Sequence, residues 1–322
     1  MNEPLAKSVP TAAGPLVNPS VRQSGCYWAI ADTMEQTIRT TVQLVVNPTA
    51  GTYRATIVAA LRGAFERAGA QVIVSECAPG IAFAIDPNAD QVCSIGGDGT
   101  VRHVALASAA CGRPVPLSIY PTGTINLIHR EAACSLVPDH FAERVLGGAG
   151  RRHHYAVSLN ETLFLACASV GPDSAAVAAL SPCLKRRIGR LAYAAAFCRT
   201  LLRWPRHEII LEADGRTISC EAFYVAKGRF FAGPWSFAPA ARLHAPELHV
   251  VALGKVTRLR YLRFLLTMLV GARIDRVPGA SCFSCTELSA RSAHPLPVQA
   301  DGDIVAALPV TLSLRPDPIL FH

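Results

Sequence analysis

Gln91-Val-Cys-Ser-Ile-Gly-Gly-Asp-Gly-Thr100 is the stretch of sequence that decides the fold class. Gln91 to Ile95 is typical of a short buried strand, and a turn of small residues, Gly96 to Thr100, follows it directly. Apolar residues then recur at helical spacing from Val101 to Ala110. A strand, a tight turn and a helix in this order predict one unit of an α/β domain with a parallel sheet.

The same order of elements occurs on both sides of this stretch. Val42 to Val46 predicts a strand that ends at the turn Asn47-Pro-Thr-Ala-Gly51, and Tyr53 to Ala68 predicts a helix with one apolar face. Leu117 to Tyr120 predicts a further strand, which ends in Pro121-Thr-Gly-Thr124. These repeats predict a Rossmann-like α/β domain.

Beyond about residue 150 the sequence favours short strands instead. Turn signals such as Asp214-Gly215 separate them, which is typical of antiparallel pairing. The expected strands are His154–Leu159, Leu163–Ser169, His207–Ala213, Thr217–Ala226, Leu248–Leu253, Cys282–Leu288, Val298–Ala300 and Val310–Leu314. With two helical insertions, near residues 175–204 and 255–272, they predict an antiparallel β-sandwich.

A chain of 322 residues is long enough for two domains at about 150 residues each. We expect a flexible N-terminal leader over residues 1–40, because four prolines lie among polar residues there. An α/β nucleotide-binding domain over residues 41–152 and a β-sandwich domain over 153–322 follow. The last strand of the chain can also join the sheet of the first domain.

Composition narrows the function classes. Hydrophobic residues make up 51% of the chain, which excludes a mostly disordered protein. Lys plus Arg is 31 against 23 Asp plus Glu, so the net charge of +8 suits anionic partners such as nucleotide phosphates or an anionic membrane. No apolar run is long enough to span a membrane. The 11 scattered cysteines predict reduced thiols in the cytoplasm, and Cys282 and Cys285 are expected to be two ordinary buried cysteines.

The three small-residue turns share one design. Each follows a predicted strand, and in an open parallel sheet such ends line a common ligand crevice. Glycines let a phosphate approach the backbone, and Thr49, Thr100 and Thr124 add hydroxyl donors. Neither a Walker P-loop nor a Gly-x-Gly-x-x-Gly fingerprint is present. Asp98 is a carboxylate inside a phosphate-binding loop, so it is expected to hold a metal, activate a hydroxyl or bind a polar group.

In their order and spacing, the three turns resemble the catalytic domain of the diacylglycerol kinase and sphingosine kinase family of lipid kinases. The resemblance extends from Thr41 to the C-terminus. It implies ATP and Mg²⁺ in the crevice between a phosphofructokinase- and NAD kinase-like α/β domain and a β-sandwich, with a lipid hydroxyl (diacylglycerol, a sphingoid base or ceramide) as acceptor. The residues that match the family's nucleotide contacts are Asn47, Pro48, Thr49, Ala50, Gly51, Ser75, Gly96, Gly97, Asp98, Gly99, Thr100, Val101, Arg102 and Thr124.

The resemblance also implies two candidates for the general base. Asp301-Gly302-Asp303 matches an Asp-Gly-Glu segment of the family, so Asp303 takes the position of its general base. In the sphingosine kinases this role falls to the carboxylate that matches Asp98. We keep both Asp303 and Asp98 as candidates for the general base. Taken without the resemblance, Asp301-Gly302 is more simply a β-turn.

The chain departs from the family pattern at several positions. Arg102 follows the glycine loop where the family has Asn, and it is expected either to contact phosphate or to be a solvated helix residue. Pro246-Glu247 replaces an Asp-Gly that the family associates with a structural Mg²⁺, so this metal site is expected to be lost or altered. The departures motivate one rival reading, a kinase-like module without catalysis. A second rival is an NAD kinase, which shares the glycine loop.

Two basic stretches, Lys185–Arg206 and Lys255–Arg276, combine arginines with apolar residues. Such patterns suit a peripheral helix on an anionic membrane, or an amphipathic helix packed on the β domain with its cations in water. The two interpretations are about equal for the first stretch, and the packed helix is favoured for the second. A homodimeric assembly is compatible with the sequence. Positive charge alone does not support a nucleic-acid partner.

Overall fold

The computed structural model describes residues 39–78, 83–148, 150–179 and 197–322. The expected leader, except for its last two residues, lies outside the described residues. So does the first half of the basic stretch Lys185–Arg206.

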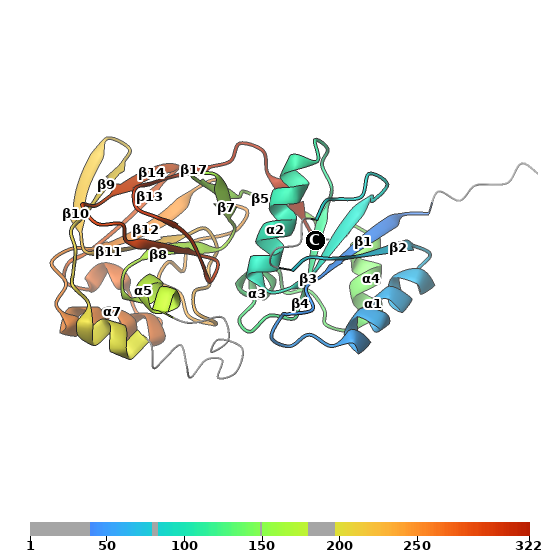
Figure 1. Ribbon diagram of the computed structural model, residues 1–322, viewed down its shortest axis with the longest axis horizontal. Helices are drawn as coiled ribbons and strands as arrows, with labels where there is room; N and C mark the ends of the chain where they lie inside the picture. The colour runs from blue at the N-terminus through green and yellow to red at the C-terminus, as the bar shows by residue number, and fades with distance from the viewer. Residues whose placement is uncertain (1–38, 79–82, 149, 180–196) are drawn as a thin grey trace, which may run out of the picture. The chain divides into compact units, whose positions relative to one another are not determined.

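The first sheet carries the three turns (Figure 1). Within the described residues its strand order is β2-β1-β3-β4-β18-β5. The first four strands are parallel to their neighbours, which confirms the predicted parallel sheet of the first domain: β1 (Thr41–Val46), β2 (Gln71–Glu76), β3 (Gln91–Gly96) and β4 (Leu117–Pro121). The C-terminal strand β18 (Ile319–Phe321) pairs with β4, and β5 (Arg152–His154) pairs with β18.

Helices cover both faces of this sheet and thereby bury β1 along its whole length. Val42 and Leu44 pack in one core cluster with α1 (Ala55–Arg67) and α4 (Pro138–Leu146). Val45 packs in another cluster with α2 (Asp98–Ala110) and α3 (Leu127–Ala132). Alternate strand residues point to opposite faces, so a strand whose residues are all buried requires cover on both sides.

Two antiparallel sheets form the second domain. Their strand orders, over the described residues, are β10-β9-β14-β17-β6-β7 and β13-β12-β11-β8-β15-β16. The first comprises β6 (Val157–Leu159), β7 (Thr162–Phe164), β9 (Ile209–Ala213), β10 (Arg216–Cys220), β14 (Glu287–Arg291) and β17 (Val310–Leu314). The second comprises β8 (Cys167–Val170), β11 (Ala222–Ala226), β12 (Leu248–Leu253), β13 (Ala280–Cys285), β15 (Pro297–Ala300) and β16 (Asp303–Ala307). One apolar cluster draws residues from both sheets, which confirms the predicted sandwich.

Helical segments accompany the sandwich. They are α5 (Pro172–Ala179), α7 (Arg258–Leu269) and the 3₁₀ turn η1 (Ile274–Arg276), and residues 197–203 are also helical. No helix in the described part of the chain is both long and apolar enough to cross a membrane.

Several boundaries differ from the sequence predictions. The expected strand Thr217–Ala226 is two strands, β10 and β11, in different sheets, with a break at Glu221. Cys282–Leu288 likewise divides between β13 and β14 at Thr286. At these corners the chain passes from one sheet to the other. The expected strands His154–Leu159 and Leu163–Ser169 divide in the same way, the first into β5 and β6 and the second into β7 and β8. Cys282 is exposed rather than buried, and β16 and β18 were missed.

Candidate functional site

The three small-residue turns meet at the carboxyl ends of the parallel strands. Thr52 N donates to Thr122 O at 2.9 Å, and Thr122 N donates to Gly96 O at 2.9 Å. A Cβ atom added at Gly123 would lie only 2.5 Å from Gly97 Cα. Glycine is therefore required where the second and third turns cross.

Asn47 links the first turn, which runs through Pro48 and Ala50, to the glycine loop. Its Nδ2 donates to Thr100 Oγ1 at 2.9 Å, while its Oδ1 accepts from Thr49 N and from Thr49 Oγ1. Gly51 abuts the third turn, because a Cβ atom there would lie 2.9 Å from Thr124 Oγ1. The predicted turn residues are thus assembled through their own hydrogen bonds.

Asp98 is the first residue of α2 and binds the start of α3. Its Oδ2 accepts from Leu127 N at 2.8 Å, and its Oδ1 accepts from Ile128 N at 3.1 Å. Burial raises the pKa of the Asp98 carboxyl to about 7, against the opposing effect of these two hydrogen bonds. Asp98 is expected from the sequence to hold a metal, activate a hydroxyl or bind a polar group. In the structure its carboxylate binds two backbone N–H groups.

A tight hairpin positions the second candidate carboxylate. Asp301 and Gly302 connect β15 to β16 with φ values of 47° and 89°, as a two-residue primed turn requires. The buried Asp301 carboxylate accepts from the backbone N–H groups of Leu165, Ala166 and Cys167 at 2.8–3.1 Å. Asp301 therefore fixes the hairpin, and the next acidic residue faces the glycine loop.

Asp303 lies against the glycine loop. A Cβ atom at Gly99 would be 2.6 Å from Asp303 Oδ2, so any larger residue there would displace this carboxylate. The Asp303 side chain keeps 42% of its surface exposed. The hairpin of one domain thus brings a solvent-accessible carboxylate to the N-terminal turn of α2 in the other.

Arg102 extends from α2 to the same hairpin. Its Nη1 donates to Ala300 O at 2.9 Å, and its Nη2 donates to Asp303 Oδ2 at 3.1 Å. The side chain is only 8% exposed, so the expectation of a solvated helix residue is wrong. The guanidinium leaves water because a backbone carbonyl and a carboxylate replace its hydration.

Two residues that the resemblance matches to nucleotide contacts, Ser75 and Val101, have side chains that contact other protein groups. Ser75 lies on the edge strand β2, where its hydroxyl accepts from Gln43 Nε2 at 3.0 Å. The Val101 side chain is buried in the core, which leaves only its backbone for a ligand. His103 beside it has a pKa lowered by burial and by Arg102.

Lys227 is a buried cation that sequence reasoning missed. It follows β11, is fully buried, and donates from Nζ to the carbonyls of Arg242 (2.9 Å), Leu243 (2.7 Å) and Ala245 (2.7 Å). Burial lowers the pKa of Lys227 to about 8. The only advance signal is a lysine directly after the apolar run Ala222–Ala226.

The same loop is where the family resemblance places a structural Mg²⁺. The residues present do not fit that ion, because the Lys227 ammonium already binds three carbonyl oxygens there and Pro246 offers no carboxylate. The neighbouring carboxylate of Glu247 interacts with Lys227 and His249 instead. Over the described ranges, no cluster of three His, Cys, Asp or Glu side chains could hold a metal.

Glu131, a second residue that the sequence did not reveal, ties α3 to the sandwich domain. Its Oε1 accepts from Leu243 N at 2.8 Å, and its Oε2 accepts from Arg229 N at 2.6 Å. The carbonyl of that same Leu243 accepts from Lys227. A chain of hydrogen bonds therefore runs from the loop through Glu131 to α3, whose first amides bind Asp98.

The assembled site combines two chemical capacities. The N-terminal turn of α2 and the glycine-containing turns offer backbone N–H groups and a helix dipole, which suit an anion such as a phosphate. Asp303 offers an accessible carboxylate at the same loop, which suits the binding and deprotonation of a hydroxyl.

Comparisons with known proteins show the family and the fold of the chain. Two family models match the chain: the diacylglycerol kinase catalytic domain over residues 41–156, and the YegS C-terminal NAD kinase beta sandwich-like domain over residues 166–321. Three solved structures described as a diacylglycerol kinase from Bacillus anthracis str. Sterne share the fold, with TM-scores of 0.71, 0.69 and 0.68 at 16% identity. The alignments cover 87% of this chain and 94%, 96% and 96% of those chains. No curated protein matches the chain significantly.

Proposed function

Because the chain belongs to the diacylglycerol kinase-like family of lipid kinases, we propose that it phosphorylates a lipid hydroxyl with ATP at a membrane surface. Diacylglycerol is the leading acceptor, and a sphingoid base or ceramide is the related alternative. The membrane contact is peripheral and on the cytoplasmic side, where ATP is available.

One observation carries the proposal. Asp303 places a 42% exposed carboxylate against Gly99, at the helix N-terminus where the three turns meet. An acceptor hydroxyl and a transferred phosphoryl group need this proximity of a proton acceptor and a phosphate-binding loop.

In the proposed reaction Asp303 is the general base. It accepts the proton of the lipid hydroxyl while the hydroxyl oxygen bonds to the γ-phosphorus and the bond from that phosphorus to ADP breaks. Arg102 holds the carboxylate in place from the side opposite the solvent. Asp98 is a positioning residue in this account, because both of its oxygens bind backbone N–H groups of α3.

ATP enters this reaction as its complex with Mg²⁺, which neutralises phosphate charge. The turn Asn47–Gly51, the glycine loop and Thr124 are the proposed phosphate contacts, because they converge at one point. Arg102 makes its hydrogen bonds to the hairpin instead, so its proposed contribution is indirect.

Transfer from γ-labelled ATP to candidate acceptors tests this function. The panel contains diacylglycerol, ceramide, sphingosine and monoacylglycerol in mixed micelles, with NAD as a soluble acceptor. We expect a labelled lipid and no labelled NAD. Labelled NAD without labelled lipid would replace the proposal by an NAD kinase, and ATP binding without any transfer would replace it by a non-catalytic module.

A further inference from the structure

The outer face of α7 exposes apolar side chains that the fold does not use. Leu259, Leu262, Leu266 and Val270 are exposed, with Leu259 and Val270 at 75%. Their spacing of three, four and four residues places them in one stripe along the helix. A stripe of this size in contact with water is unusual for a surface helix and indicates a binding surface.

The opposite face of α7 is fully engaged. Tyr261, Phe264 and Met268 are buried in the core cluster beneath the helix. The outer leucines are therefore not needed to attach α7 to the domain. The helix is therefore apolar on two faces, whereas an ordinary amphipathic helix packed on a domain has one apolar face.

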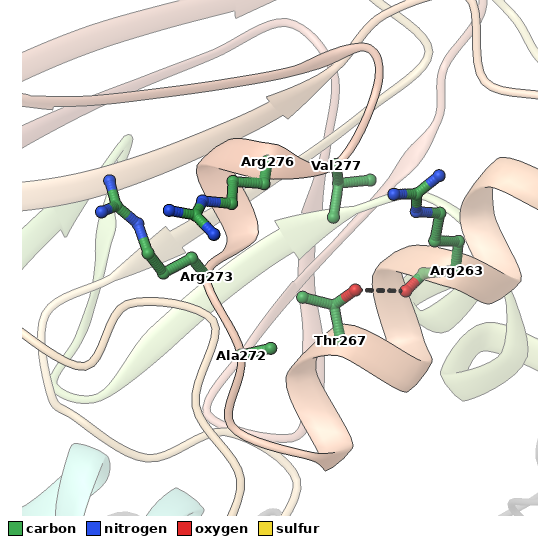
Figure 2. A pocket seen from close by; sticks show the side chains of 6 residues that line it. All are labelled: Arg263, Thr267, Ala272, Arg273, Arg276 and Val277. Atoms are coloured by element: carbon green, nitrogen blue, oxygen red, sulfur yellow. Dashed lines mark hydrogen bonds between the residues drawn. The ribbon is translucent and has the colours of Figure 1, made fainter.

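A basic pocket lies between α7 and the segment that follows it (Figure 2). Arg263 of α7 and Arg273 and Arg276 near η1 line a cavity of about 380 Å³, together with Thr267. Asp275 is paired with Arg273 and also interacts electrostatically with Arg276, whereas the described residues contain no ion-pair partner for Arg263. Positive charge is thus concentrated beside the exposed leucines.

The neighbouring helical segment continues the surface. Arg258 Nε donates to Leu201 O at 3.2 Å, which places the segment 197–203 beside the start of α7. Leu202 of that segment is 70% exposed. Exposed apolar side chains therefore lie on two adjacent elements.

We propose that this α7 surface, the stripe together with the arginine pocket, docks the protein on a bilayer containing anionic phospholipid. The leucines enter the interfacial region, and Arg263 and Arg276 bind lipid phosphates in the pocket. The proposal deepens the proposed function and rests on it, since it names the surface through which a lipid kinase meets its substrate's membrane.

The exposed leucines and the arginine pocket together favour an anionic bilayer as the partner. A soluble phosphate or a nucleic acid would engage the arginines and leave the leucines in water. A neutral apolar surface would bury the leucines and leave the arginine pocket without a counter-charge. An anionic bilayer alone among these satisfies both, because it offers phosphates above an apolar layer.

Sedimentation of the full chain with vesicles tests the proposal. Binding is measured on phosphatidylcholine vesicles with and without phosphatidylglycerol. We expect binding only with phosphatidylglycerol, and about a hundredfold weaker binding for the triple variant Arg263→Gln, Arg273→Gln, Arg276→Gln, since each basic residue near an anionic surface contributes roughly a factor of five. A Leu262→Ser, Leu266→Ser variant should also lose binding.

A matched control removes the same charge elsewhere. Arg62, Arg152 and Arg216 are exposed residues of α1, β5 and β10, and their triple substitution by Gln should keep nearly wild-type vesicle binding. Equal losses in the two triple variants would mean that net charge alone drives binding, and would overturn the docking surface. Wild-type binding by the Arg263, Arg273, Arg276 variant would overturn it as well. Arginine-dependent binding of inorganic phosphate without binding of vesicles would reassign the pocket to soluble anions.

A second readout separates this surface from the catalytic proposal. Turnover on a short-chain, monomerically dissolved diacylglycerol should be the same in the wild type and in the Arg263, Arg273, Arg276 variant, with unchanged thermal unfolding. Loss of that turnover in a folded variant would contradict a pure docking role. Arginine-dependent vesicle binding by a protein that phosphorylates no lipid would refute the proposed function and leave the docking surface standing.

Discussion

Arg102 Nη2 lies 3.1 Å from Asp303 Oδ2, in an ion pair between α2 of the first domain and β16 of the second. The guanidinium is 8% exposed and the carboxylate 42% exposed, so the pair presents its acidic member to solvent. Because Arg102 also donates to Ala300 O, it fixes the hairpin at two points. The proposed base is therefore held from its buried side and remains open to a substrate on the other.

Substitution of Arg102 separates a positioning role from phosphate binding. Arg102→Met should lower kcat by about tenfold or more while the affinity for ATP changes little, since a misplaced catalytic group costs rate rather than nucleotide binding. Arg102→Lys should rescue only part of the loss, because an ammonium cannot reach both Ala300 O and Asp303 with the same geometry. Steady-state kinetics and ATP titration provide the two numbers. A large loss of ATP affinity with kcat preserved would favour direct phosphate contact.

The raised pKa of Asp98 predicts a pH-dependent stability. Its folded pKa is about 7 against a reference value of 3.8, so the native state holds a proton that the unfolded state has released between about pH 4 and 7. The free energy of unfolding therefore gains from Asp98 at low pH and loses that gain as the pH rises through 7. Asp98→Asn should destabilise the protein by about 1–3 kcal/mol at about pH 5 and by less at about pH 8, in urea unfolding. A deficit independent of pH would contradict this explanation.

Gly123 tests the convergence of the turns. In Gly123→Ala the new Cβ atom would meet Gly97 Cα at 2.5 Å, and both partners are backbone that cannot rotate away. The second and third turns must separate, so ATP should bind at least about tenfold more weakly, because phosphate sites depend on close backbone approach. Gly63→Ala, where the Cβ atom meets only the mobile end of Arg67, is the matched control and should leave ATP affinity unchanged. Equal ATP affinities in both variants would place the nucleotide elsewhere.

Lys227 should stabilise its loop without any metal. Lys227→Met keeps a similar volume but leaves the carbonyls of Arg242, Leu243 and Ala245 without their donor, at a cost of about 3 kcal/mol if each lost hydrogen bond is worth about 1 kcal/mol. Chemical denaturation measures this loss, and chelation of divalent ions should leave wild-type unfolding unchanged. A wild-type protein that is destabilised by the chelator would show that a metal is bound at a structural site after all.

The sequence predicts those parts of the site that depend on local rules. A strand followed by Gly96-Gly97 and a helix, repeated along the chain, is sufficient for a parallel sheet with converging turns. Asp301-Gly302 predicts a tight turn from residue type alone, and the hairpin places Asp303 as a consequence.

The remaining features depend on partners that leave no local pattern. Arg102 and Asp303 are 201 residues apart in sequence, so the helix that carries Arg102 gives no indication of its partner. Lys227 binds backbone carbonyls, which every residue possesses and no motif records. The break at Glu221 escapes prediction because apolar residues continue on both sides as the chain changes sheets.

Phosphoryl transfer by Asp303→Asn tests the central claim most directly. With γ-labelled ATP and diacylglycerol in mixed micelles, the variant should lose about 10²–10⁴-fold in kcat, as expected for removal of a general base. It should bind ATP like the wild type and remain folded at the assay temperature, although the loss of the ion pair with Arg102 lowers its stability. Asp317→Asn, an exposed carboxylate of the same domain, should retain full turnover. Undiminished turnover in Asp303→Asn would remove Asp303 from the mechanism and contradict the account.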